Sequence, residues 1–408
     1  MLRHWLAQRR DVPPRAALPT TVWMLGCVSL LMDVSSEMVA ALLPIYLTSG
    51  LGVSVMALGL LEGLSVAIAT VTKFLSGLWV DRSRRAKPLA VLGYGLGAVS
   101  RLIFPVASSM DHIVLAKSMD RVGKGIRGTP RDAIIAAVSP PQLRGASFGL
   151  RKSLDTVGGF LGPIIAVLAM VVLAQDIRAV YWLATVPAAL AIVVLVLCVT
   201  EPDGPSSLAG SRFRLSDSLR LNRQVWSVIG LAALIMLARF SEAFVLLKSL
   251  EAGFTPTWVP LSLVIMHLAY GATAYPVGKL SDTIGTTGLL LCSLGFLLGA
   301  HLLLAIAASV WVYILATVMW GLHMGFSQGL LGAMIAAATP QTLRGSAFGT
   351  FNLVTGAVVL LGNTAAGWLW TYSSPAMPFF AGAGISLVAG VLICLRSGIA
   401  RGRRQSCR

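Results

Sequence analysis

The chain has 408 residues, of which 56% are hydrophobic and only 12% are charged. Soluble domains usually carry about 25% charged residues, so a soluble protein of this length is excluded, as are disordered and fibrous classes. The net charge of +16 would indicate nucleic-acid binding in a soluble protein. In a membrane protein a positive net charge more often reflects cytoplasmic loops rich in Lys and Arg. The positions of the charges along the chain decide between these two interpretations.

Apolar segments of about 20 residues recur along the whole chain. Each of them is long enough to cross a bilayer as a helix. The apolar runs are continuous rather than alternating, which disfavours a closed barrel. The first of them contains acidic residues, so we expect a retained helix rather than a cleaved signal peptide. The sequence predicts an all-α membrane protein with twelve spans, at residues 20–48, 55–80, 88–108, 112–138, 144–173, 178–199, 224–250, 257–281, 286–308, 310–338, 344–371 and 376–395.

Basic residues gather on one side of these spans. The side that holds both termini carries 20 Lys and Arg residues, whereas the opposite loops carry two. By the positive-inside rule, both termini are expected in the cytoplasm, in a multi-pass protein of the inner (cytoplasmic) membrane. The predicted order is a cytoplasmic tail, a six-helix bundle, a cytoplasmic linker, a second six-helix bundle and a basic tail, at residues 1–19, 20–199, 200–223, 224–395 and 396–408.

The two predicted bundles share a sequence repeat. Residues 134–149 read IIAAVSPPQLRGASFG and residues 334–349 read MIAAATPQTLRGSAFG, at an offset of 200 without a gap. Agreement at Leu-Arg-Gly and Phe-Gly makes a chance match between apolar helices improbable. A parallel duplication of six helices places a substrate site between the two halves, near the middle of the membrane.

Three local patterns resemble the Major Facilitator Superfamily, and the resemblance covers essentially the whole chain. The first, Gly77-Leu-Trp-Val-Asp81-Arg82, is similar to that family's loop motif between helices 2 and 3. A weaker copy, Gly278-Lys-Leu-Ser-Asp282, follows at an offset of 201. The resemblance implies two pseudo-symmetric six-helix bundles, with a gating latch at these residues that breaks when the halves rock.

The other two patterns concern proton coupling and the direction of transport. Arg121-Val-Gly-Lys124-Gly resembles the helix 4 motif R-x-x-Q-G, whose arginine is associated in the family with proton coupling, and Lys124 stands where Gln is usual. Gly158, Gly162 and Pro163 match the helix 5 antiporter motif, which is associated with exporters. We expect these three residues to form a close-packed seam that takes part in conformational gating.

Ionisable residues inside the spans are costly, which makes each of them a functional candidate. The N-terminal half carries nine basic residues and six acids there, whereas the C-terminal half carries Arg239 and Glu242 with three histidines. Five basic residues of the fourth span share one helix face: Lys117, Arg121, Lys124, Arg127 and Arg131. Such a face cannot contact lipid. It must line a cavity or pair with acids on neighbouring helices.

Two groups of site residues are expected from these charges. A carboxylate paired with an arginine can exchange a proton for substrate, and the proton-coupling group is Asp33, Glu37, Asp155 and Arg121. The cations exceed the acids in the N-terminal interior, which favours an anionic or oxygen-rich chelating substrate. The substrate-binding group is Lys124, Arg127, Arg131, Arg151, Glu62 and Glu242. A static salt-bridge network is the alternative interpretation of any single pair.

The sequence therefore predicts a proton-coupled secondary transporter that works by alternating access and exports a small anionic or metal-chelating molecule, such as a siderophore, metabolite or drug. Residues 33–38 and 120–133 resemble a bacterial efflux subgroup that includes carriers linked to siderophores. A proton-coupled importer of a small solute or iron chelate, and a metal-ion exporter, are the alternatives.

Catalysis is not expected, because H-E-x-x-H and P-loop patterns are absent from the sequence. We predict no cofactor, no resident metal and no nucleic acid. The expected partners are a small-molecule substrate, protons and the lipid bilayer, with a monomer as the working expectation.

Overall fold

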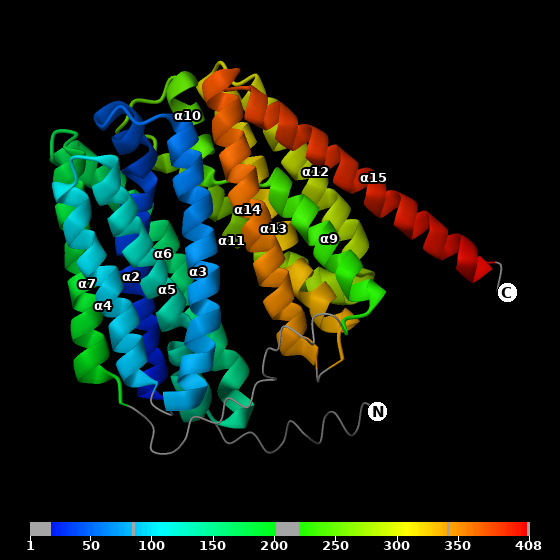
Figure 1. Ribbon diagram of the computed structural model, residues 1–408, viewed down its shortest axis with the longest axis horizontal. Coiled ribbons are helices and arrows are strands. Elements are labelled where there is room, and N and C mark those ends of the chain that lie inside the picture. Colours follow the sequence, from blue (N-terminus) through cyan, green and yellow to red (C-terminus); the bar gives the residue numbers. More distant parts are fainter. Residues whose placement is uncertain (1–17, 84–85, 201–219, 341–342, 406–408) are drawn as a thin grey trace.

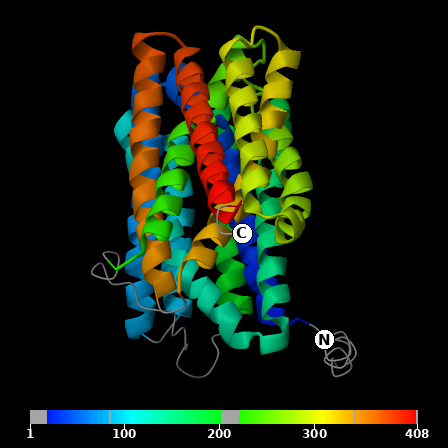
Figure 2. The ribbon, with the colours of Figure 1, turned by 90° about the vertical axis from the view of Figure 1, so that its right-hand side faces the viewer.

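The computed structural model describes residues 18–83, 86–200, 220–340 and 343–405, which are helical apart from short turns and contain no strand (Figure 1). The first bundle consists of α2 (Thr20–Ile45, continued by the π-helical turn η1, Tyr46–Gly50), α3 (Val55–Ser83), α4 (Lys87–Ile103), α5 (Met110–Val138), α6 (Arg144–Val172) and α7 (Ile177–Cys198). The second consists of α9 (Arg223–Ala238), α10 (Glu242–Glu251), α11 (Leu261–Ile284), α12 (Thr286–Ala305), α13 (Val310–Ala338), α14 (Arg344–Tyr372) and α15 (Met377–Gln405). Seen from the side, most of these helices run roughly parallel to one another (Figure 2).

The predicted fold class, an all-helical protein with twelve spans, is confirmed. Eleven of the described segments are long and apolar enough to cross a membrane, with α9 and α10 counted as one. The remaining long helix, α5, has 29 residues and is long enough to span. Its lower hydropathy follows from the charged face that the sequence predicts for it. α15 continues beyond the predicted end at residue 395 as far as Gln405.

The sequence repeat is also a repeat of helices. α5 and α13 each have 29 residues and begin and end 200 positions apart, and α6 and α14 keep the same length and offset. Leu143 and Leu343, which precede α6 and α14, have nearly identical backbone angles (φ −106°, ψ 0° and φ −108°, ψ 1°). The two halves therefore build the same helix–turn–helix unit from the repeated sequence.

Side chains at the helix starts account for several boundaries. The Asp176 carboxylate accepts hydrogen bonds from the backbone N–H groups of Arg178 and Ala179, at 2.9 and 3.2 Å, and so caps α7. The turn between α11 and α12 is made by Gly285, whose φ of +82° favours glycine.

The span predicted at 224–250 is not one continuous helix, because it is interrupted between α9 and α10. The backbone groups freed by the interruption have partners. His301 Nε2 lies 3.1 Å from the Ala238 carbonyl oxygen, and the Ser241 N–H donates to Asn363 Oδ1 at 2.6 Å. The Ser241 hydroxyl also caps α10. Since an unpaired backbone group inside a membrane is costly, these contacts stabilise the interruption as part of the fold.

The two bundles are joined at one end. We call the end where α7 ends and α9 begins the linker end, and the end where α2 ends and α3 begins the far end (lower and upper in Figure 1). At the far end Ile45 shares a buried cluster with Phe244, and Leu247 shares one with α2 and α7. Towards the linker end, in the described residues, the clusters around Leu195 and Ile335 each draw on one half. The structure is therefore closed at the far end.

Candidate functional site

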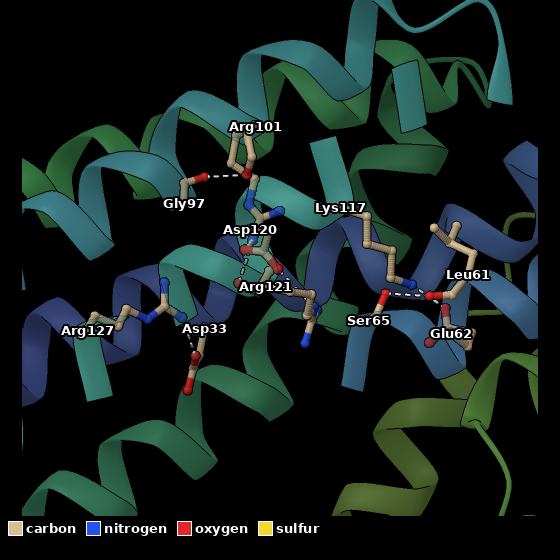
Figure 3. A network of polar contacts seen from close by, with 12 residues as sticks. Asp33, Leu61, Glu62, Ser65, Gly97, Arg101, Lys117, Asp120, Arg121 and Arg127 are labelled. Atoms are coloured by element: carbon tan, nitrogen blue, oxygen red, sulfur yellow. Dashed lines mark hydrogen bonds and ion pairs between the residues drawn. The ribbon is translucent and has the colours of Figure 1, made fainter. Parts of the chain in front are cut away.

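The basic face of α5 is the centre of a polar network inside the first bundle (Figure 3). Its side chains reach α2, α3 and α4, with successive contacts along the helix. The sequence left two readings open, a lined cavity or pairing with acids on neighbouring helices. The structure shows pairing for most of these cations, whereas Lys124 is exposed.

Asp120 is the most buried acid of the network. One carboxylate oxygen accepts a hydrogen bond from Arg101 Nη2 of α4 at 2.6 Å, and the other forms an ion pair with Arg121 Nη2 at 3.1 Å (Figure 3). Arg101 also donates to the Ser36 hydroxyl at 2.7 Å, which brings α2 into the same cluster. The Arg101 and Asp120 side chains are 2% and 3% exposed. A buried charge that loses such a partner is strongly destabilising, so we assign this cluster to structure.

The pair of Asp33 and Arg127 is looser. Arg127 Nη2 lies 3.9 Å from Asp33 Oδ1, which is beyond hydrogen-bonding distance. The guanidinium sits over the Tyr94 ring at 4.9 Å, and its Nη1 is buried without a hydrogen-bond partner in the described chain. Asp33, one-quarter exposed, is therefore held weakly and is accessible to water. This arrangement suits a carboxylate that exchanges protons.

Towards the linker end the predicted cations are paired with nearby acids. Arg131 contacts Asp132 at 3.1 Å and donates to the Ser29 hydroxyl at 3.0 Å. Arg151 contacts Asp155 at 2.8 Å, one helical turn away on α6. Both arginines lie in the same region because Arg151 Nε also approaches Asp132, at 3.8 Å.

Lys124 is the exposed cation of the basic face, and no ion pair joins it to another described residue within 4.0 Å. Leu115, nine residues earlier on the same helix, is also exposed, at 53%. At about 100° per residue the two side chains point in opposite directions. Leu115 is apolar and suits the lipid side. Lys124 therefore faces inward, in the electrostatic field of Asp33 and Glu37.

Glu37 occupies a different environment from the other acids. It is half-buried and has no ion-pair partner within 4.0 Å in the described chain. The charged groups that act on it come from both halves: His267, Lys124, Asp33 and Arg121. Of the predicted proton-coupling acids, Glu37 and Asp33 lie close together, whereas Asp155 is bound to Arg151.

The predicted glycine seam on α6 packs directly against the two acids of α2. A Cβ on Gly158 would lie 3.0 Å from the Asp33 Cβ, and a Cβ on Gly162 would lie 2.7 Å from the Glu37 Cβ. Both would also meet backbone carbonyl oxygens of α2 at 2.7 Å. Such distances are too short for a real side chain, so these glycines allow the approach of α2 and α6. Pro163 lies inside α6 immediately after Gly162.

Glu62 lies where the first bundle meets the second. Its carboxylate forms an ion pair with Lys117 of α5 (Figure 3), and the Ser241 hydroxyl at the start of α10 contributes to its electrostatic surroundings. α3 approaches the second half closely here, because a Cβ on Gly59 would lie 2.3 Å from the Asn363 carbonyl oxygen. Glu62 is thus held by the first half at the contact between the halves, beside the interrupted helix.

The remaining predicted site residues are placed as follows. Glu242 contacts Arg239 at 3.0 Å within the second bundle. Gly278 is exposed, with open space around it. The side chains of the other latch residues, and the environment of Gly77, lie outside what the structure describes: Asp81, Arg82 and Asp282.

Sequence reasoning missed three contributors to the network. Arg101 and Asp120 were counted among the intramembrane charges, and their opposite signs on adjacent spans were the available signal of a pair. Tyr94 gave no signal, because an aromatic residue in an apolar span is ordinary. No group of three or more His, Cys, Asp and Glu side chains in the described residues is arranged to hold a metal ion.

Comparison with known families decides the identity of this architecture. The model of the Major Facilitator Superfamily matches residues 25–266 and 231–405. The chain belongs to the Major Facilitator Superfamily. Family and fold together make it a multi-pass membrane protein of the MFS transporter type.

Several members of this superfamily are similar over nearly their full length. An uncharacterized MFS-type transporter of Methanocaldococcus jannaschii is 29% identical over 384 residues, covering 92% of this chain and 94% of the relative. The inner membrane transport protein YajR of Escherichia coli is 24% identical, covering 90% and 81%. The nucleoside transporter NupG has the same fold, with a TM-score of 0.77 at 15% identity, covering 92% of this chain and 99% of NupG.

Proposed function

We propose that this superfamily member is a proton-coupled exporter of a small anionic or oxygen-rich chelating molecule, operating by alternating access across the inner membrane. The observation that carries the proposal is the exposed Lys124, which has no ion-pair partner among the described residues and lies in the electrostatic field of Asp33 and Glu37. A cation next to proton-accepting carboxylates can hold an anion in one state and release it in another, because protonation changes the local charge.

The charge asymmetry between the halves supports an anionic substrate. At the offset of the repeat, Arg127 and Arg131 of α5 correspond to Ser327 and Leu331 of α13, although the two helices have equal length. The scaffold therefore does not need these charges for folding. A carrier of cationic compounds would be expected to show an acidic rather than a basic inner face.

Two observations favour export over the alternatives. The seam of α6 that resembles the antiporter motif packs on the two candidate proton-accepting acids, Asp33 and Glu37. The basic residues of the sequence favour a cytoplasmic linker end, and the described halves share buried clusters only at the opposite end. The structure would then correspond to the cytoplasm-facing state, which loads an exporter.

The proposal predicts separable losses of function. Vesicles with an acid interior should accumulate labelled polycarboxylate, catecholate or hydroxamate chelators through the inverted protein, and not cationic dyes. Lys124→Gln should lower this transport about tenfold or more, because one charge-assisted contact to the anion is lost. Asp33→Asn should retain substrate exchange and lose the response to the proton gradient.

The matched control for Lys124 is Lys87→Gln at the start of α4, whose ammonium donates to the Val196 carbonyl oxygen at 3.0 Å outside the network, and this variant should transport as wild type. Uptake in the opposite direction under the same gradient would favour the importer. Selective accumulation of dyes, or normal transport by both Lys124→Gln and Asp33→Asn, would contradict the proposal.

Alternating access further requires that the far-end contacts of Glu62 break in the opposite state. A cysteine pair at Met56 and Thr371, whose backbone N and hydroxyl oxygen lie 3.0 Å apart across the halves, should crosslink readily. Glu62→Gln and Ser241→Ala should each slow crosslinking severalfold, because the link between α3 and α10 is weakened. Glu251→Gln removes a far-end pair within one half, with Lys248 at 2.5 Å, and should leave the rate unchanged; equal rates in all variants would exclude this role.

A further inference from the structure

Glu37 and His267 approach the same face of α6 from opposite halves. A Cβ on Gly162 would lie 2.7 Å from the Glu37 Cβ, and a Cβ on Gly159 would lie 4.0 Å from His267 Nε2. Positions three apart on a helix are neighbours, with Cβ atoms about 5–6 Å apart. One turn of α6 therefore brings together an acid of α2 and an imidazole of α11.

Glu37 has no ion-pair partner, and His267 Nδ1 has no hydrogen-bond partner, among the described residues of their own halves. His267 Nδ1 is buried and has no hydrogen-bond partner among the described residues. Glu37 forms no ion pair within 4.0 Å there, and His267 is the foremost of the charged groups that act on it. Buried polar atoms without partners are rare and call for an explanation. His301 and His323 each have one ring nitrogen without a partner as well, but their other nitrogen contacts a backbone carbonyl oxygen, of Ala238 and Ser293, whereas His267 makes no such contact among the described residues.

The charged surroundings restrict which groups exchange protons at this point. α2 contributes Asp33, α5 contributes Arg121 and Lys124, and α6 contributes Asp155, which is bound to Arg151. Arginine and lysine keep their protons near neutral pH, whereas imidazole exchanges its proton readily in that range. His267 is the imidazole that the second half supplies to this group of side chains.

We propose that Glu37 and His267 form one proton site divided between the two halves, with His267 as the coupling residue of the second half. The inference rests on the proposed proton-coupled transport and adds a residue and a mechanism to it. With one proton bound, an imidazolium faces the Glu37 carboxylate and their attraction holds α11 against α2 and α6. When that proton leaves to water, a neutral imidazole faces the carboxylate, which Lys124 and Arg121 then hold in the first half. Proton occupancy thereby biases the position of the halves.

The test measures the halves directly and needs no substrate. Spin labels at Gln142→Cys and Ile284→Cys, two exposed residues at the linker ends of the halves, report the distance between them in lipid nanodiscs from pH 5.5 to 8.5, with the natural cysteines replaced. The wild-type protein should shift between two distance populations. His267→Gln and Glu37→Gln should each remove most of that shift, and the double variant should add nothing further.

His267→Lys separates a charge role from a packing role. A permanent cation should hold the low-pH distance at all pH values, whereas His267→Gln should hold the high-pH distance. His112→Gln, an exposed histidine at the start of α5, is the matched control and should keep the wild-type shift. Size-exclusion profiles establish that each variant is folded.

The outcomes distinguish this inference from the proposed function. A wild-type shift that persists in His267→Gln overturns the divided site and leaves proton coupling standing. A wild-type protein with no pH-dependent shift overturns both.

Discussion

Asp120→Asn is expected to be among the most destabilising single substitutions in the first bundle. The change leaves Arg101, which is 2% exposed, without its carboxylate at 2.6 Å, and deprives Arg121 of its contact at 3.1 Å. Breaking a buried ion pair by removing one partner costs about 3–5 kcal/mol, because an uncompensated charge remains. Thermal unfolding in detergent should shift to a much lower temperature, with a reduced yield of folded protein.

The control variant for Asp120→Asn lies on the same helix, α5. Asp111→Asn changes the same residue type at an exposed position in the first turn of α5 and should alter stability by less than about 0.5 kcal/mol. The double variant Arg101→Met, Asp120→Leu should recover much of the lost stability, since apolar replacements of a buried pair are often tolerated. Equal unfolding temperatures for Asp120→Asn and Asp111→Asn would contradict the structural role given to this cluster.

Gly162→Ala should disrupt both packing and transport. The added methyl group would lie 2.7 Å from the Glu37 Cβ and from the Val34 carbonyl oxygen, so α2 and α6 must separate. Overpacking of this kind costs about 1–3 kcal/mol. It also displaces Glu37 from its neighbours of the second half. Transport in vesicles should fall by more than tenfold in protein that still folds.

Gly149→Ala, at another glycine of α6, is the matched control. No atom outside its own helix turn lies within 4 Å of a Cβ at Gly149, and alanine favours a helix over glycine by about 1 kcal/mol. This variant should be as active as wild type and equally or more stable. Loss of transport in both variants, or in neither, would show that the close approach at Gly162 is not the reason for the glycine.

Local patterns in the sequence were sufficient for the fold and for one pair of the site. Hydropathy and basic loops predict twelve spans, and an ungapped repeat predicts two equivalent halves. The one-face spacing of Lys117 to Arg131 predicts that acids of neighbouring helices approach α5, and the contact of Arg127 with Asp33 agrees with it. These features depend on periodicity within one helix, which a single sequence contains.

Contacts that depend on the depth and rotation of different helices could not be obtained in this way. Arg101 meets Asp120 because α4 and α5 pack at one particular register. His267 acts electrostatically on Glu37 only because the two halves approach each other at this point. The interruption before Ser241 was also missed, because the apolar runs on either side of it, residues 225–238 and 243–247, together have the length of one span. Its signal was local, a serine followed by an acid, as at a helix start.

The interrupted helix has a consequence for where the moving bodies divide. α9 packs against α14 and α15 of its own half, whereas α10 contacts α2 of the first half as well as α11 and α13 of the second. Phe244 and Leu247 place α10 in buried clusters to which both halves contribute. α10 therefore lies on the dividing surface itself, and α9 lies behind it. Opening of the far end would require α10 to part from α2, and the break before Ser241 would let it do so without displacing α9.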